Sequence, residues 1–216
     1  MCISDRSEYA QQRVYVVDDD QGMLDSTVWL FESIGLQAQP FTSGQAFLDA
    51  CDAAAPACVL LDVRMPGMGG LAVQEAMRER GIELPVIFVS AHADVPIVVR
   101  AFRGGAVDFI EKPYNEQLLL DSVQRALSQR RVFIHPQIPA VQARFESLTP
   151  RESDILLPLV QGFNNREIAE QLGISVKTVD LYRSRVMKRM QADSLPALVG
   201  MVIGLGLIDP FTLRLI

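Results

Sequence analysis

Short apolar runs alternate with amphipathic segments through the first 130 residues of this 216-residue chain. The apolar runs predict five strands, at residues 13–17, 36–41, 58–62, 85–90 and 107–110. Helical periodicity between them predicts helices at residues 22–33, 43–53, 71–80, 95–103 and 116–129. Several runs, such as Val86 to Val89, are apolar on both strand faces, as a buried parallel strand requires. The pattern predicts an α/β fold, a doubly wound five-stranded parallel sheet with helices on both faces.

The alternation stops near residue 130, and an all-helical pattern follows. Residues 130–140 contain two Arg, Pro136 and Pro139 with no clean period, which indicates a linker. Beyond them Thr149, Pro150 and Glu152 predict a helix start with an N-cap, a first-turn proline and a capping box. Three further helical segments predict a small all-α domain. The domains are therefore predicted at residues 1–126 and 147–216, joined by residues 127–146, which include the end of the last helix before the linker.

Composition narrows the class of protein. With 216 residues, 49% of them hydrophobic, the chain can form one well-packed hydrophobic core, and two cores are expected. Its three cysteines form no CxxC pair and have no metal-type spacing, which favours a reducing, cytoplasmic compartment. The longest apolar run, residues 195–208, has 14 residues and is too short to cross a bilayer. No membrane partner is therefore expected.

Charge is divided unevenly between the two predicted domains. Residues 1–125 hold 9 Lys and Arg against 18 Asp and Glu, which gives a net charge of −9. Residues 126–216 hold 11 against 8, which gives +3, so the overall charge of −6 hides the division. An acidic front half and a basic back half indicate different partners for the two domains.

Acidic residues follow two of the predicted strands. Asp18 and Asp19 come after the first strand, and Asp62 ends the third. The carboxyl ends of parallel strands meet at one edge of the sheet, where open α/β sheets place their chemistry. At about 4 Å, each ionised pair would cost roughly 4 kcal/mol at an effective dielectric of about 20. Either one acid is therefore protonated or a divalent cation sits among them, and oxygen ligands favour Mg²⁺.

Two further polar residues are predicted at the same edge. Ser90 ends the fourth strand, and Lys112 follows the fifth, just before Pro113. A carboxylate nucleophile, a metal ion, a hydroxyl and a lysine are the parts of an aspartyl-phosphate site. In such a site, Lys112 and the metal neutralise phosphoryl oxygens while Ser90 donates to a third.

The first 125 residues resemble a two-component receiver domain, which implies a flavodoxin-like fold. The matching segments are VVDDD at residues 16–20, LDVRMPG at 61–67, FVSA at 88–91 and DFIEKP at 108–113. The resemblance implies that Asp62 is the phosphoacceptor. It also implies that Mg²⁺ or Mn²⁺ is held by Asp18, Asp19, Asp62 and the backbone carbonyl of Arg64.

The same resemblance assigns the residues that transmit the signal. Ser90 corresponds to the switch hydroxyl, where family members often carry Thr. Phe109 corresponds to the aromatic side chain that turns inward with that hydroxyl. Arg64 and His92 occupy positions that vary in the family and tune the lifetime of the phosphoryl group, so this lifetime cannot be predicted.

Residues 165–190 predict a helix, a turn and a second helix. Gly173 breaks the first helix, and Ser175 caps the second. The residues expected to point inward from the second helix are Val176, Val179, Val186, Met187 and Met190. Five basic residues remain for its other faces, against one acid: Lys177, Arg183, Arg185, Lys188 and Arg189, with Asp180. A helix-turn-helix with a basic surface predicts DNA binding.

The back half resembles the LuxR-type DNA-binding domain. The matching segments are residues 148–152, 165–169 and 175–179, and the order of the domains matches the NarL/FixJ response regulators. Residues 194–199 favour the FixJ branch. By position, four residues of the predicted recognition helix should touch DNA phosphates: Lys177, Thr178, Arg185 and Lys188. Three should face base edges: Asp180, Leu181 and Ser184. The last helix, at residues 195–205, would dimerise on DNA.

Together the resemblances imply a two-component response regulator. A sensor histidine kinase would phosphorylate Asp62, and the new charge would draw Ser90 and Phe109 toward it. The surface of residues 95–103 and 107–110 would then change, so that the protein forms a homodimer, releases its DNA-binding domain, or both, and binds double-stranded DNA. The chain would not be an enzyme, beyond catalysing its own phosphoryl transfer and Mg-dependent dephosphorylation.

Two other interpretations stay open at this point. A haloacid-dehalogenase-like phosphatase would use Asp18 to Asp20 as its nucleophile motif, but it leaves Asp62 and the helical half without a role. A regulator of the same fold could also act without phosphate, constitutively or through a protein partner.

Pro158 predicts a kink in its helix, because an interior proline costs about 3 kcal/mol. The apolar tail at residues 207–216 has no assigned role.

Overall fold

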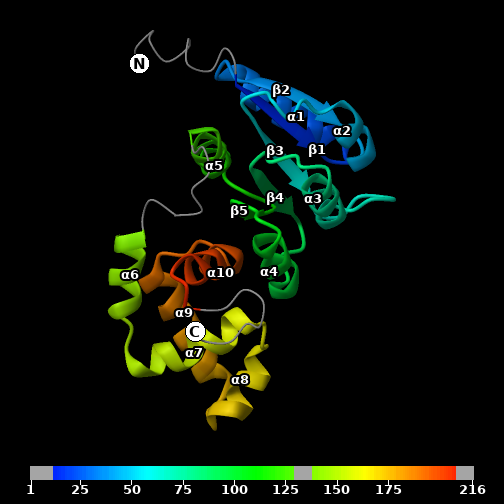
Figure 1. The fold of residues 1–216 in the computed structure, drawn as a ribbon. Helices are drawn as coiled ribbons and strands as arrows, with labels where there is room; N and C mark the ends of the chain where they lie inside the picture. Colours follow the sequence, from blue (N-terminus) through cyan, green and yellow to red (C-terminus); the bar gives the residue numbers. More distant parts are fainter. Residues whose placement is uncertain (1–11, 129–137, 208–216) are drawn as a thin grey trace. The chain divides into compact units, whose positions relative to one another are not determined.

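The structure is a computed structural model that describes residues 12–128 and 138–207 (Figure 1). The described residues fall into two compact units. The first contains the residues up to 92 and those from 104 to the end of α5 (Glu116–Ser128). The second contains α4 (Val95–Arg103) and the helices from residue 138 onwards. No helix in the described ranges is long and apolar enough to span a bilayer.

The first unit is built on one sheet of five parallel strands in the order β2-β1-β3-β4-β5. The strands are β1 (Arg13–Val17), β2 (Gln37–Phe41), β3 (Ala57–Asp62), β4 (Val86–Ser90) and β5 (Asp108–Glu111). Helices α1 (Gln21–Ser33), α2 (Gly44–Ala50) and α3 (Gly70–Glu79) follow the first three strands. The doubly wound parallel sheet predicted from the alternation is confirmed, with most element ends within two residues of the expected positions.

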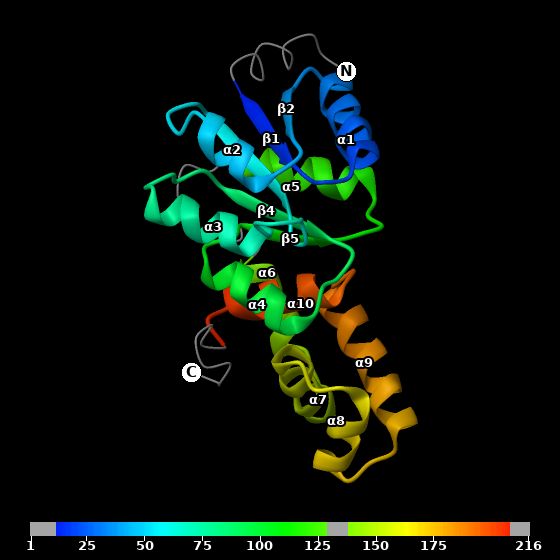
Figure 2. The same ribbon diagram turned by 90° about the vertical axis from the view of Figure 1, so that its right-hand side faces the viewer.

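Each face of the sheet packs against its own helices (Figure 2). On one face, alternate residues of the central strands, such as Val16 and Leu60, join a core with side chains of α1 and α5. On the other face, the ring of Tyr15 lies 5.5 Å from that of Phe47 on α2. Because both faces are covered, β3 and β4 are buried along their whole length, as their continuous apolar sequences predicted.

The second unit is entirely helical. Its helices, besides α4, are α6 (Ile138–Glu146), α7 (Pro150–Gln161), α8 (Asn165–Leu172), α9 (Val176–Met190) and α10 (Leu195–Gly204). A small core joins α7, α8 and α9 through Ile155, Ile168 and Val179, all nearly inaccessible to solvent. The predicted capping box of Thr149 and Glu152 is present at the start of α7. Gly173 ends α8 in the left-handed conformation, with φ of 66°.

Two local expectations differ from the structure. The stretch expected to be an irregular linker contains α6, in which Pro139 is the second residue, a position where the missing N–H is not needed. Helix α7 includes Pro158 and ends at Gln161, so the proline does not end the helix. Val176 is 40% exposed, whereas Val179 is buried, because the helix begins at Val176 beyond the packed core. Residues 208–216 of the apolar tail lie outside the described residues.

Candidate functional site

The carboxyl ends of β1 and β3 bring two acids together. These strands are neighbours, and Val17 pairs with Leu61, so Asp18 and Asp62 follow at the same level of the sheet. Both residues are more than nine-tenths buried. The sequence placed these two carboxylates at one sheet edge, and the register shows how they meet there.

Lys112 lies between the two acids. Its Nζ donates to Asp18 Oδ2 at 2.7 Å and to Asp62 Oδ1 at 2.9 Å. The backbone N–H of Lys112 donates to the carbonyl oxygen of Ser90 at 2.8 Å, which fixes the end of β5 beside β4. The sequence predicts that protonation of one acid or a bound divalent cation reduces the repulsion between the carboxylates. In the structure, the ammonium group of Lys112 balances part of their charge.

Backbone N–H groups bind the other carboxylate oxygens. Arg64 N donates to Asp62 Oδ2 at 2.6 Å, and Asp20 N donates to Asp18 Oδ1 at 2.9 Å. Each buried acid therefore accepts one bond from Lys112 and one from the turn that follows its strand. Four directed hydrogen bonds fix the orientation of both side chains and leave little freedom at the site.

The electrostatics of the site reflect burial and pairing. Burial raises the pKa of Asp62, an effect that the hydrogen bonds from Lys112 and Arg64 N–H offset only in part. Burial alone would lower the pKa of Lys112, but its hydrogen bonds to Asp18 and Asp62 outweigh burial and raise that pKa. Lys112 is therefore a charged group at neutral pH, held against the carboxylates.

Ser90 and Phe109 are both buried, and they lie on adjacent strands. Ser90 is 1% exposed, and its Oγ accepts a hydrogen bond from His92 N at 3.1 Å. The ring of Phe109 stacks on that of Phe88, with centroids 6.0 Å apart and planes inclined by 27°. The aromatic side chain expected to turn inward thus lies inside the unit in this structure.

The third expected carboxylate is not gathered with the others. Asp19 is exposed, while Asp20 accepts bonds from Gly22 N and Met23 N and caps α1. Within residues 12–128 and 138–207, no three His, Cys, Asp or Glu side chains are grouped to hold a metal ion. Asp18, Asp62 and the carbonyl of Arg64 still supply the oxygen donors that Mg²⁺ prefers, so the donor chemistry fits that ion.

In the second unit, α8, its turn and α9 form the predicted helix-turn-helix. Six of the seven expected DNA-contacting residues are exposed along α9: Lys177, Asp180, Leu181, Ser184, Arg185 and Lys188. Thr178 is half-buried, and its Oγ1 lies 2.7 Å from Ser175 Oγ in the cap of α9. Its hydroxyl is therefore less available than the sequence position alone suggested.

One polar contact between α8 and α9 was missed by sequence reasoning. Asn165 donates to the carboxylate of Asp180 through Nδ2 and accepts from Arg183 Nη1 at 3.3 Å through Oδ1. These bonds hold Asp180 against α8 near the N-terminal end of α9. The only signal in the sequence is the pair of amide side chains Asn164-Asn165 where α8 begins.

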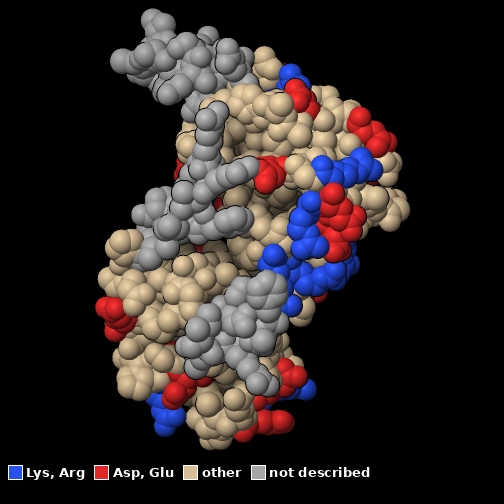
Figure 3. Space-filling model, viewed as in Figure 1, with Lys and Arg blue, Asp and Glu red and all other residues tan. Residues whose placement is uncertain are grey.

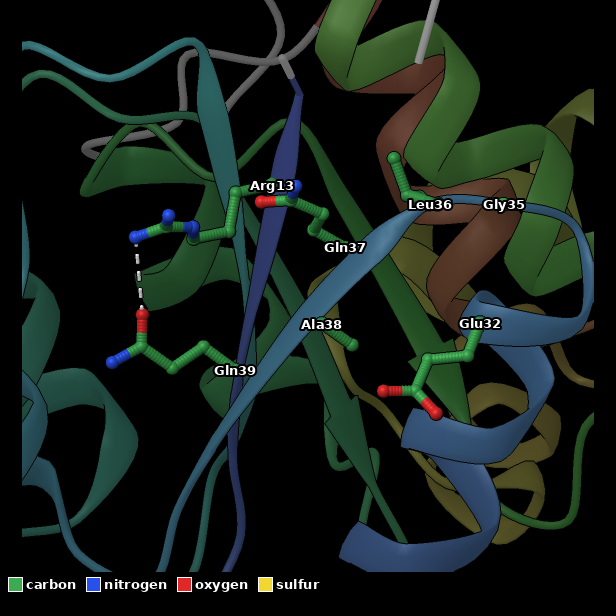
Figure 4. Close-up of a pocket in the computed structure, with 7 residues that line it drawn as sticks. All are labelled: Arg13, Glu32, Gly35, Leu36, Gln37, Ala38 and Gln39. Atoms are coloured by element: carbon green, nitrogen blue, oxygen red, sulfur yellow. Dashed lines mark hydrogen bonds between the residues drawn. The ribbon is translucent and has the colours of Figure 1, made fainter. Parts of the chain in front are cut away.

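A pocket at the opposite edge of the sheet holds none of these residues. It has a volume of about 470 Å³ and lies where β1 and β2 begin, beside the end of α1 (Figure 4). Arg13 Nη1 donates to Gln39 Oε1 at 3.2 Å on one side of it, and Glu32 and Gly35 also line it. Because ligands of open α/β sheets bind at the carboxyl ends of the strands, we assign this pocket no function.

Two family descriptions match the chain. The response regulator receiver domain matches residues 14–124, and the luxR family of bacterial regulatory proteins matches residues 146–202. The chain belongs to the response regulators. It combines a receiver with a LuxR-type DNA-binding domain, which makes this regulator a transcriptional response regulator rather than a member of a conventional enzyme family.

Curated relatives match this chain along most of its length. The regulator is 42% identical over 188 residues to the response regulator protein TmoT of Ectopseudomonas mendocina, covering 86% of both chains. It is 37% identical over 198 residues to the transcriptional regulatory protein FixJ of Bradyrhizobium diazoefficiens, covering 91% of this chain and 97% of FixJ. The expected resemblance to the FixJ group is thus confirmed across both halves.

Solved structures agree with this assignment. Full-length FixJ from B. japonicum matches with 36% identity and a TM-score of 0.51, covering 91% of this chain and 98% of that chain. The response regulator StyR matches with 35% identity and a TM-score of 0.53, covering 90% and 99%. We refer below to the first unit as the receiver unit and to the second as the helical unit.

Proposed function

We propose that this regulator is switched by phosphorylation of Asp62 and that the switch controls DNA binding by α9. The observation that carries the proposal is the arrangement of Asp62, Asp18 and Lys112 at one edge of the sheet. Asp62 is a preoriented carboxylate with a lysine ammonium on one oxygen and a backbone N–H on the other. Such a group can attack phosphorus, while the neighbouring donors neutralise the transferred oxygens.

The phosphodonor in our proposal is a sensor histidine kinase. An oxygen of Asp62 forms a bond to phosphorus as the P–N bond to the donor imidazole breaks, and the imidazole takes up a proton. Lys112 contacts both acids, so its ammonium is already placed to hold an oxygen of the incoming group. Mg²⁺ or Mn²⁺, held by Asp18, Asp19, Asp62 and the carbonyl of Arg64, would supply further positive charge for the phosphoryl oxygens.

Ser90 and Phe109 carry the signal away from Asp62 in this proposal. The Oγ of Ser90 is buried beside the site and, in this structure, accepts from His92 N. A phosphoryl group on Asp62 offers a strong acceptor, so the hydroxyl of Ser90 turns toward it as donor. Phe109 lies on the next strand opposite Phe88, where it is buried, and turns with Ser90 in this proposal. This change then favours a homodimer, release of the DNA-binding domain, or both.

Helix α9 is the proposed DNA-reading element. Its exposed cations Lys177, Arg185 and Lys188 suit phosphates, and Leu181, 50% exposed, suits an apolar contact with a base edge. Ser184 and Asp180 lie on the same exposed side, and Thr178 stands in the first turn. Two copies of α9, brought together by dimerisation through α10, would read successive major grooves.

The test of the phosphoacceptor is direct. The full chain is incubated with acetyl phosphate and Mg²⁺, and its intact mass is measured. We expect one added phosphoryl group in the wild type and none in Asp62→Asn. Asp20→Asn is the matched control, because it makes the same change in the same acidic region and Asn still caps α1. Phosphorylation of Asp62→Asn at the wild-type level would refute the assignment.

A further inference from the structure

A groove of about 840 Å³ lies in the helical unit, between the first turn of α7 and the C-terminal half of α9. Both walls come from the same unit, in which α7 and α9 lie side by side (Figure 2). The lining residues are Thr149, Pro150, Arg151 and Glu152 on the α7 side and Tyr182, Arg185, Lys188, Arg189 and Gln191 on the α9 side. The groove is therefore open beside the helix that carries the proposed base-reading residues.

The charges of the residues that line the groove do not cancel. Four lining side chains are cations: Arg151, Arg185, Lys188 and Arg189. Glu152 is the single acid among the lining residues. A concave surface with four positive groups and one negative group attracts anions, and its concave walls concentrate the field.

The single acid, Glu152, is already engaged in hydrogen bonds and an ion pair within the helical unit. Glu152 is 2% exposed, and its Oε2 accepts from Thr149 N at 2.8 Å in the capping box. Arg189 Nε lies 3.3 Å from the same oxygen, and Arg189 Nη1 donates to Ser147 O at 2.7 Å. Glu152 and Arg189 thus neutralise each other and join the two walls, which leaves three cations for a ligand.

These three cations converge on the groove from two helices. The Arg185 guanidinium lies over the Tyr182 ring, 5.5 Å from its centre, which is within the range of a cation–π interaction. Lys188 is exposed one turn further along α9. Arg151 stands in the first turn of α7, where its side chain is 65% exposed and Nη1 lies 3.7 Å from Asp154 Oδ2. That long, exposed pair binds Arg151 only weakly, so the guanidinium can turn to another anion.

We propose that this groove binds a phosphodiester of the DNA backbone and that Arg151 is a DNA-contacting residue together with Arg185 and Lys188. This inference rests on the proposed DNA-binding function and extends it from α9 to the first turn of α7. The first turn of α7, a helix of 12 residues, adds the positive end of the helix dipole to the same side.

The position of the groove on α9 selects a DNA phosphate over a free anion. Arg185 lies four residues after Leu181, and Lys188 lies four residues after Ser184, so each cation is one turn from an exposed base-reading residue on the same side of the helix. A DNA strand whose bases face Leu181 and Ser184 carries its backbone past the groove.

The salt dependence of DNA binding tests the proposal. The full chain, treated with beryllofluoride and Mg²⁺, is titrated into a labelled duplex of randomised sequence, and anisotropy is followed over a salt series. One lost phosphate contact lowers the slope of log affinity against log salt by about 0.9, which is roughly eightfold in affinity near ~0.1 M salt. We expect this loss for Arg151→Gln, a larger loss for Arg151→Glu, and a nearly normal slope for Arg151→Lys.

The matched control is Arg78→Gln in α3. Arg78 is 69% exposed and pairs with Glu75, also three residues away, so the two arginines share exposure, pairing and charge change. Lys and Arg lie beside Asp and Glu over this part of the receiver unit (Figure 3). The control should keep the wild-type slope, and circular dichroism confirms that each variant is folded.

Three outcomes separate the possibilities. If Arg151→Gln loses slope and Arg78→Gln does not, the groove binds a backbone phosphate. If both variants keep the wild-type slope while the wild type binds the duplex, the groove proposal is overturned and DNA binding by α9 stands. If the treated wild type does not bind the duplex at all, the proposed function itself fails.

Discussion

The charged site of the receiver unit is buried and its members face one another, whereas the charged surface of the helical unit is exposed and faces outward. Lys112 forms ion pairs with Asp18 and Asp62 at less than 3 Å, and the three side chains together carry a net negative charge. Lys177, Arg185 and Lys188 project from α9 into solvent. A buried, paired site responds strongly to one added charge, while an exposed cationic surface suits a large external polyanion. The two arrangements fit an input and an output.

The most severe test of this contrast removes the cation from the buried site. Lys112→Met leaves Asp18 and Asp62 facing each other without a counter-charge, and we expect the receiver unit to lose about 3 kcal/mol of stability. The measurement is urea unfolding followed by peptide-resolved hydrogen exchange, which separates the two units. The double variant with Asp62→Asn should recover part of the loss. Unchanged exchange in β1 and β3 would show that the pairing contributes nothing.

A second test concerns the buried acid of the helical unit. Glu152→Gln keeps the capping geometry but removes the charge facing Arg189, and we expect a loss of about 1 to 2 kcal/mol in the helical unit. The hydrogen bond from Thr149 N–H, with smaller help from Arg189, lowers the pKa of Glu152. Its contribution is therefore present at neutral pH and lost as pH falls below about 4.3.

The control for that variant is Asp154→Asn, which changes an exposed carboxylate two residues away. It should leave the stability of the helical unit within about 0.5 kcal/mol of the wild type. Thermal unfolding at several pH values gives both profiles. An equal loss of stability from pH 7 to pH 3 in the wild type and in Glu152→Gln would show that Glu152 has no such role.

A smaller effect of opposite sign is expected at the phosphoacceptor. Burial raises the pKa of Asp62 above its unfolded value of about 3.9, so the ionised side chain costs stability at neutral pH. Asp62→Asn removes that cost but keeps an acceptor for only one of its two donors, so we expect a gain of about 1 kcal/mol. The gain should be present at pH 7 and disappear below pH ~4 in urea titrations. A loss of stability at pH 7 would contradict this account.

The smallest change in stability is expected on α9. Lys177→Gln alters an exposed side chain at the start of the helix, so stability should change by less than about 0.5 kcal/mol. Its affinity for duplex DNA should nevertheless fall, equally for all sequences, because a phosphate contact carries no sequence information. Anisotropy titrations with two unrelated duplexes measure this. A loss confined to one duplex would instead make Lys177 a base-reading residue.

Much of the fold could be predicted because its signals are local. Apolar runs such as residues 58–61 are typical of buried strands, and in a parallel sheet the acids that end such strands lie at the sheet edge. The capping box of Thr149 and Glu152 likewise depends on residues three apart. Helix α6 could not be predicted, because Pro136 and Pro139 indicate an irregular linker, whereas Pro139 is tolerated in the first turn of that helix.

The sequence predicts which residues form the site better than it predicts the contacts between them. The sequence placed Asp18, Asp62 and Lys112 at one edge, but not the two bonds of Lys112, which span 94 and 50 residues of chain. The sequence also does not distinguish the roles of the three consecutive acids. Asp20 caps α1 and Asp19 is exposed because of the direction that the backbone takes after β1, which the sequence does not reveal. The burial of Val179 against the exposure of Val176 depends on where α8 and α7 pack.

The most direct test of the central claim joins the two units in one measurement. The full chain is titrated into a duplex selected from a random pool, with and without beryllofluoride and Mg²⁺, as wild type, Asp62→Asn and Asp20→Asn. Beryllofluoride stands in for the phosphoryl group on the acid. Our account predicts tighter DNA binding on addition of beryllofluoride in the wild type and Asp20→Asn, and no response in Asp62→Asn. An equal response in Asp62→Asn, or none in the wild type, would contradict control of α9 through Asp62.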